Sequence, residues 1–271
     1  MSTDPLLLQK EQMILQTQIE QPKSSLNVFE LPCGYLSPDG TVHSEVVLRE
    51  MTGREEDLLA AKKTDYIKKM NELFVRCIER LGSLTEKTQI AAAVPELLIG
   101  DRAFLMFAIR RVTLGDEYPF TTRCPECEKE SLVDVDLSEM TIKKMKEPTK
   151  RVYDGVLTGG MTYRYHLLTG KDESKLSKVE DPDAKITQSM QMRLDMFNER
   201  APTREAIAAL PMRLRAELRE AFDEVDGGVD TTVELTCPKC DHEYSTDLET
   251  GQSGFFFPSA ARRNSKKKSS T

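Results

Sequence analysis

Apolar and polar positions alternate in several short segments of the chain, a pattern that predicts β-hairpins. The first hairpin is expected within 26–48, where two apolar stretches flank Ser37-Pro38-Asp39-Gly40, with Pro and Gly at positions that a type I turn favours. A second is expected over 120–137, and two further strands surround Gly159-Gly160. A last hairpin, over 229–248, repeats the arrangement of 120–137, and this is the one internal repeat that the sequence indicates.

Apolar residues at three- and four-residue spacings predict helices between these hairpins. Thr52 suits the N-cap of a helix that opens with acidic residues. The segment 97–114 is apolar nearly all round, so we expect it to be the central helix of the core, ended by Gly115. Two amphipathic helices are expected over 186–201 and 202–225. A longer helix after Thr52 is expected from one apolar stripe formed by Ile67, Met70, Leu73, Phe74, Cys77, Ile78, Leu81 and Leu84.

Composition and charge narrow the class of protein. Of the 271 residues, 39% are hydrophobic and 31% are charged, which is enough apolar material for a core and excludes a wholly disordered chain. No apolar run approaches the length of a membrane-spanning helix. The first residues lack the basic region of a secretory signal, so we expect synthesis in the cytosol. The net charge is −7, and the tail 262–268 carries five positive charges, so the remainder at −12 is expected to bind nucleic acid poorly.

Four of the six cysteines form two motifs of identical spacing, Cys124-Pro125-Glu126-Cys127 and Cys237-Pro238-Lys239-Cys240. In a cytosolic chain, such pairs indicate a metal site rather than disulfides. Two thiolates three positions apart on a tight turn face one ion, and two such turns supply the four ligands that structural zinc prefers. We therefore expect these cysteines to bind one structural Zn²⁺. Two disulfides, or a site that has lost its metal, are the alternatives.

The other candidate residues give weaker signals. His242 follows the second motif and is an alternative ligand, but four cysteines already fill a tetrahedral site. Cys33 and Cys77 stand alone and are expected to be core thiols. No recognised catalytic motif occurs, so we expect no enzyme. The aromatic run Phe255, Phe256 and Phe257 cannot all face one small core, so we predict that it contributes to partner binding.

These observations predict an α+β protein with a mostly helical body, an N-terminal β-hairpin and a split four-cysteine zinc ribbon. We expect a flexible N-terminal arm over 1–25 and a hairpin plus helical core over 26–117. The split ribbon comprises 118–138 and 229–249, and it brackets a β/helical insertion over 139–228. An apolar and then basic tail occupies 250–271. The residues around the cysteine turns are mostly acidic, which opposes nucleic-acid binding through the ribbon itself.

Several short segments resemble one known family. They are FELPCGY at 29–35, DGTVH at 39–43, LREMTGREED at 48–57, LIGDR at 98–102, LGDEY at 114–118, both cysteine motifs and FFP at 256–258. Together they resemble the T4-type baseplate proteins of contractile-tailed bacteriophages, which are baseplate hub components or hub-assembly chaperones. The resemblance covers 26–140 and 229–258, while 148–226 and the basic tail fall outside it.

The resemblance implies a non-enzymatic protein of the virion tail baseplate, made in the host cytoplasm. Its expected partners are other baseplate and tail proteins. The sequence itself adds that no membrane is expected and that the charge balance disfavours nucleic acid. Three functions remain open at this point. The first is a structural subunit of a contractile tail baseplate. The second is a transient hub-assembly chaperone that is not kept in the virion. The third is a zinc-ribbon nucleic-acid-binding regulator that uses the basic tail. The extended ends of the chain favour the first.

Overall fold

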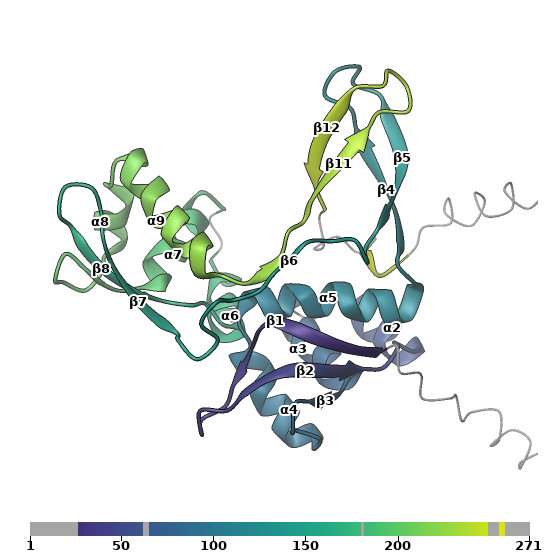
Figure 1. Ribbon diagram of the computed structural model, residues 1–271, viewed down its shortest axis with the longest axis horizontal. Helices are drawn as coiled ribbons and strands as arrows, with labels where there is room; N and C mark the ends of the chain where they lie inside the picture. Colours follow the sequence, from purple (N-terminus) through teal and green to yellow (C-terminus); the bar gives the residue numbers. More distant parts are fainter. Residues whose placement is uncertain (1–26, 62–64, 180–181, 249–254, 258–271) are drawn as a thin grey trace, which may run out of the picture.

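The computed structural model describes residues 27–61, 65–179, 182–248 and 255–257 (Figure 1). The predicted flexible arm and the basic tail lie outside these residues. The first part of the fold, called the first unit, runs from residue 28 to residue 114. Its strands β1 (Val28–Leu36), β2 (Val42–Leu48) and β3 (Ile78–Leu81) form an antiparallel sheet with β2 in the centre. Its helices are α2 (Gly53–Ala60), α3 (Tyr66–Cys77), α4 (Lys87–Ala93), the 3-10 turn η2 (Val94–Glu96) and α5 (Ile99–Leu114).

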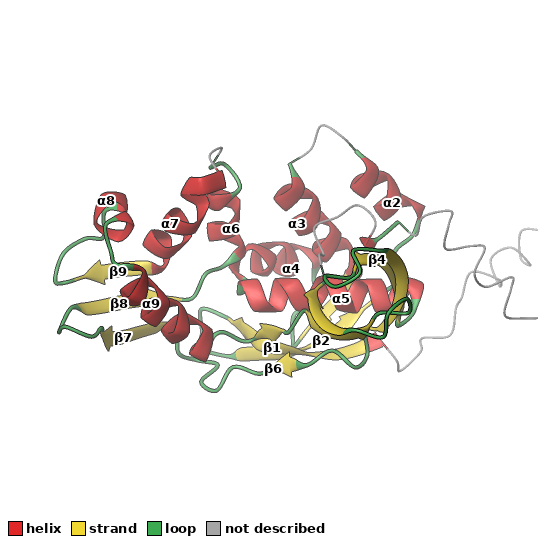
Figure 2. Cartoon of the chain, turned by 90° about the horizontal axis from the view of Figure 1, so that it is seen from above, coloured by secondary structure: helices red, strands yellow, loops and turns green. Residues whose placement is uncertain are grey.

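The second unit, residues 152–225, has the same order of elements. Its sheet is formed by β7 (Val152–Val156), β8 (Thr162–His166) and β9 (Leu194–Phe197), with β8 in the centre. Its helices are α6 (Gly170–Leu176), α7 (Pro182–Arg193), α8 (Arg204–Ala208) and α9 (Met212–Val225). Seen from above, α7, α6, α3 and α2 lie in one row, with the strands of both units on the opposite side (Figure 2).

Local details also repeat, so the internal repeat is larger than the pair of hairpins that the sequence indicates. The turns after β1 and β7 close with the same two backbone bonds, Ser37 with Thr41 and Leu157 with Met161 being the outer pairs. A capping box begins both α2 and α6. The residue after the third strand has positive φ in both units, at Gly82 and at Asn198. Each unit is followed by a hairpin that carries one cysteine motif.

The expectation of a mostly helical body is wrong, because the structure is 39% helix and 30% strand, distributed over several small sheets. Two predicted helices are shorter than their apolar stripes. The stripe over 67–84 ends as helix at Cys77, and the stripe over 186–201 ends as helix at Arg193. A strand follows each of them directly, and it completes a three-stranded sheet.

A bulge explains why these two strands resembled helix in the sequence. In β3, Glu79 is an extra residue between two positions that pair with β2, so Ile78 and Leu81 both face the core. Their three-residue spacing continues the stripe of α3. Asp195 is the corresponding extra residue in β9.

The cysteine hairpins project side by side from the end of α5 (Figure 1). One is formed by β4 (Glu117–Arg123) and β5 (Glu130–Asp136), the other by β11 (Thr232–Thr236) and β12 (Glu243–Asp247). A short pair, β6 (Ile142–Lys143) with β10 (Gly228–Val229), lies where the chain passes from one hairpin to the second unit and back. The segments before and after the second unit therefore meet both at β6–β10 and at the hairpin tips.

Buried apolar residues form two clusters, and the second, formed mostly by the second unit, also includes Cys33 and Leu98 of the first. The predicted central helix is confirmed as α5, and its side chains Leu105, Phe107 and Ile109 are almost fully buried. The second core gathers around Tyr165, Leu218 and Phe222. Within the described segments, no helix is both long enough and apolar enough to cross a membrane.

Candidate metal centre

The first cysteine turn connects β4 to β5. Cys124 comes directly after β4, its N–H donates to the carbonyl of Lys129, and its own carbonyl accepts from the N–H of Glu128. Glu128 has a φ of 56°, a left-handed conformation that side chains other than glycine adopt rarely. This turn brings the thiols of Cys124 and Cys127 to the same side of the hairpin tip.

The second turn, between β11 and β12, has the same construction. The N–H of Cys237 donates to the carbonyl of His242, and the N–H of Asp241 donates to the carbonyl of Cys237. Asp241 has a φ of 58° and matches Glu128. Sequence reasoning found the cysteines but missed Glu128 and Asp241, because neither is the glycine that would signal a left-handed position.

All four thiols meet at the hairpin tips. The Cys124 and Cys240 sulfurs lie 3.8 Å apart, the Cys127 and Cys237 sulfurs 3.7 Å apart, and all four within 4.8 Å of one another. A disulfide requires about 2.05 Å. A tetrahedral ion with metal–sulfur bonds of about 2.3 Å holds its sulfurs about 3.8 Å apart. The spacing therefore fits four ligands around one metal ion and does not fit two disulfides.

The surroundings of the thiols shift the pKa values of Cys237 and Cys240 in opposite directions. The N–H of Lys239 donates to the Cys237 sulfur at 3.4 Å and lowers the pKa of Cys237 to about 7. At Cys240 the N–H of His242 favours the thiolate, but desolvation and the neighbouring thiols together outweigh it and raise the pKa of Cys240 to about 12. Without a cation, the cluster therefore resists full ionisation. A metal ion removes that conflict, because it stabilises all four thiolates together.

The other predicted site residues lie elsewhere. Among the described residues, the converging ligand group contains the four cysteines and does not include His242, whose ring stacks on Tyr244. Cys33 and Cys77 are buried, and burial raises the pKa of both thiols. Four of the six cysteines thus belong to the hairpin tips and two to the interior.

The aromatic run lies against α5 rather than in the metal centre. Phe255 is fully buried and makes edge contacts with Phe107 and Tyr118, and Phe256 is 8% exposed. Phe257 is half-buried and lines a cavity beside α2. A role of this run in partner binding stays a prediction, for which Phe257 is the least buried member.

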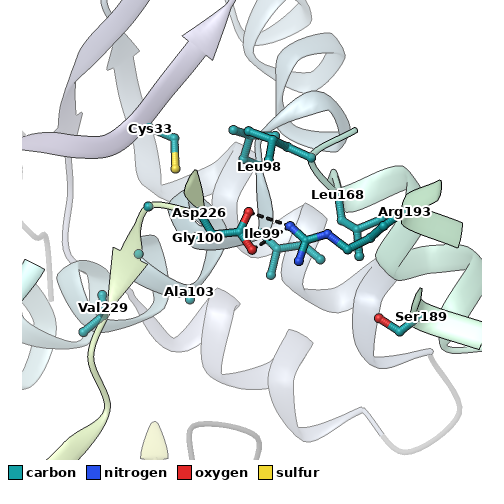
Figure 3. A pocket seen from close by; sticks show the side chains of 13 residues that line it. Cys33, Leu98, Ile99, Gly100, Ala103, Leu168, Ser189, Arg193, Asp226 and Val229 are labelled. Atoms are coloured by element: carbon teal, nitrogen blue, oxygen red, sulfur yellow. Dashed lines mark hydrogen bonds and ion pairs between the residues drawn. The ribbon is translucent and has the colours of Figure 1, made fainter. Parts of the chain in front are cut away.

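A second candidate site lies where the two units join (Figure 3). This cavity of about 360 Å³ is lined from α5 by Ile99 and Gly100 and from the end of α9 by Asp226. The guanidinium of Arg193 pairs with Asp226 at 2.5 Å across it, which leaves no net charge on this pair to attract a ligand. The metal centre is therefore the stronger candidate for a functional site.

Comparison with known proteins adds one match. The sequence profile of the family described as T4 bacteriophage base plate protein matches residues 35–257. The matched range includes 148–226, so the expectation that this segment lies outside the family is wrong. No curated protein and no solved structure matched the chain.

Proposed function

Because the chain belongs to the T4 bacteriophage base plate protein family, we propose that it is a structural subunit of a contractile tail baseplate whose four cysteines bind a structural Zn²⁺. The observation that carries the proposal is the convergence of four thiols from two separate hairpins at zinc–thiolate spacing. A base plate family supports a structural role and other phage tail proteins as partners. Four thiolates leave the metal no open position for substrate, which also supports a structural rather than a catalytic ion.

The proposed zinc connects parts of the chain that are far apart in sequence. Cys127 and Cys237 are 110 positions apart, and closing a loop of that length costs several kcal/mol of chain entropy. Binding of zinc to four thiolates contributes about 10 kcal/mol or more in small zinc domains. The ion therefore outweighs the entropy cost and holds the two hairpins together at the end of α5.

Substitution of one cysteine from each turn tests the zinc. In Cys124→Ser and Cys237→Ser, we expect bound zinc, measured by elemental mass spectrometry of the purified chain, to fall from one ion per chain to near zero. The thermal unfolding midpoint should fall in both. His242→Ala is the matched control and should retain the ion. Full metal content in both serine variants would contradict the proposed ligand set.

The location of the chain in the particle tests the baseplate role. Quantitative mass spectrometry of purified particles should find this chain in fixed proportion to other baseplate proteins. Its presence in infected-cell lysate together with absence from particles would instead support the hub-assembly chaperone. Binding of duplex DNA that weakens steeply with salt and requires the 262–268 tail would support the regulator.

A further inference from the structure

One unit covers a helical face of the other, and the equivalent face of the second unit lies uncovered at the far end of the described structure. In the first unit, the face made by α3, η2 and the start of α5 is covered by α6 of the second unit. The second unit repeats the same elements as α7, α8 and α9, at the opposite end of the molecule from α2 (Figures 1 and 2). We call the face of α7, α8 and the start of α9 the acceptor face.

A buried arginine anchors the covered face. Arg102 is the fourth residue of α5, and its Nη1 donates to the carbonyl of Val94, eight residues earlier. Its Nε donates at 2.8 Å to the carboxylate of Glu173, the fourth residue of α6. Backbone bonds complete the contact, with the N–H of Ile99 donating to Leu168 and the N–H of Gly170 donating to Leu97.

The acceptor face contains the same arginine without its carboxylate. Arg215 is the fourth residue of α9, is 9% exposed, and its Nη1 donates to the carbonyl of Ile207, again eight residues earlier. Its Nη1 and Nη2 also contact the hydroxyl of Thr187. Its Nε is buried and has no hydrogen-bond partner within the described part of the chain, and the desolvation of such a donor is costly. Nε is the atom through which Arg102 binds Glu173.

The apolar positions of the two faces differ in the same way. Met70, the fifth residue of α3, is 3% exposed, whereas Ile186, the fifth residue of α7, is 60% exposed. Met212, which occupies the place of Ile99 at the start of its helix, is 69% exposed. Ile186 also lines a cavity of about 360 Å³ between α7 and the C-terminal half of α9, which borders the acceptor face. The acceptor face therefore has the composition of a covered surface, yet it is open.

The chain carries a second copy of the element that covers such a face. Helix α2 begins with the same capping box as α6, and its fourth residue, Glu56, takes the place of Glu173. Glu56 is exposed and lies at a cavity of about 370 Å³ that Leu59 and Phe257 also line. Leu114, on the same cavity, is 39% exposed. Like α6, α2 thus offers a carboxylate beside apolar surface.

We propose that α2 of one copy docks on the acceptor face of a second copy, with Glu56 bound to Arg215 as Glu173 is bound to Arg102. The contact joins two different surfaces, so it is heterologous, and repetition gives a ring or a filament of copies. The proposal rests on the internal repeat and not on the baseplate role, which the particle analysis tests separately.

Two charge substitutions test the contact from its two sides. Sedimentation or light scattering of the full-length chain over about a hundredfold range of concentration should show self-association. Met212→Glu should raise the dissociation constant by about tenfold or more, because it places a carboxylate in the apolar contact. Glu56→Lys should do the same, because it places a cation against Arg215. Val156→Glu, at a 65% exposed site away from this face, and Glu139→Lys are the matched controls and should associate as the unmodified chain does.

Mixing the two variants gives the decisive result. The Met212→Glu copy keeps a native α2, and the Glu56→Lys copy keeps a native acceptor face, so an equimolar mixture should form a dimer that cannot grow. A chain that is monomeric at every concentration would overturn the proposal. So would association that survives both substitutions, association lost in the controls, or a mixture that stays monomeric.

Discussion

Asp101 connects α5 to β1 through a buried carboxylate. Its Oδ1 accepts the N–H of Cys33 at 2.8 Å and that of Gly34 at 3.4 Å, while its Oδ2 has no partner within the described residues. Burial raises the pKa of Asp101 to about 6, although the two backbone bonds favour the charged form. One side chain thus fixes the position of the central helix against the first sheet, at the cost of a buried charge.

Asp101 is expected to make stability depend on pH. Its pKa is about 6 in the folded chain and near 3.8 in the unfolded chain, so the folded state takes up the proton first as pH falls. As the pH falls from 7.5 to 5, this group therefore increases the free energy of unfolding by about 1 kcal/mol. Asp101→Asn removes that gain and keeps an oxygen acceptor for Cys33 and Gly34.

Urea unfolding at pH 7.5 and at pH 5 measures the difference. The stability of the unmodified chain relative to Asp101→Asn should increase at pH 5. Asp134→Asn, at an exposed position of β5, is the control and should show no such change. An unchanged difference between the two pH values would mean that Asp101 is not the titrating group.

At the level of single elements, two short helices, α2 and α6, each begin with a capping box. In α2 the carboxylate of Glu55 accepts the N–H and the hydroxyl of Thr52, and in α6 the carboxylate of Asp172 does the same for Thr169. Burial opposes ionisation of Glu55, but bonds from Arg49 and Thr52 outweigh it and lower its pKa to about 2. Helices of this length are marginal without such caps.

Loss of the capping box is expected to loosen α6. Thr169→Ala removes the hydroxyl bond to Asp172 and should lower the free energy of unfolding by about 1 kcal/mol. Denaturant unfolding measures this loss. Hydrogen exchange, compared with that of the unmodified chain, should become faster in α6 than in α5. Ser177→Ala, at the exposed C-terminal end of α6, is the control and should change stability by less than about 0.5 kcal/mol. Equal effects of the two substitutions would contradict a role for the cap.

At the scale of the whole molecule, the two units are joined by a close approach of backbones. A Cβ added at Gly100, in the first turn of α5, would lie 1.8 Å from the carbonyl oxygen of Gly227. Gly227 in turn lies against the sulfur of Cys33, 2.8 Å from where its own Cβ would be. Glycine at both positions lets the segment after α9 return across α5 to β10, and so sets the second hairpin beside the first.

Gly100→Ala is expected to destabilise the chain although alanine favours helix. The overpacked contact should cost about 1–3 kcal/mol, which a lowered thermal unfolding midpoint would show. Gly53→Ala, in the first turn of α2, is the matched control, because nothing lies within 4 Å of its added Cβ and its φ is not positive. There we expect a neutral or slightly stabilising change. A native midpoint in Gly100→Ala would contradict this account of the junction.

Features that depend on residue type and short spacing could be predicted from the sequence. The two cysteine motifs, the turn at 37–40, the cap at Thr52 and the apolar helix ending at Gly115 are local, because their chemistry lies within a few residues. The residues of the metal centre could be named for the same reason. Their convergence could be expected only by analogy with other four-cysteine sites.

Features that depend on residues far apart in the sequence could not be predicted in this way, because they arise only when the chain folds. Ile78 and Leu194 continue a helical stripe in the sequence, yet each lies in a strand because β2 or β8 offers backbone bonds that a helix end lacks. The larger repeat was missed because the two units share backbone geometry more than side chains, as Gly82 and Asn198 show. Arg102 and Arg215 were not distinguishable from other helical arginines. Their roles follow from burial and from a carboxylate on another element, which no local pattern encodes.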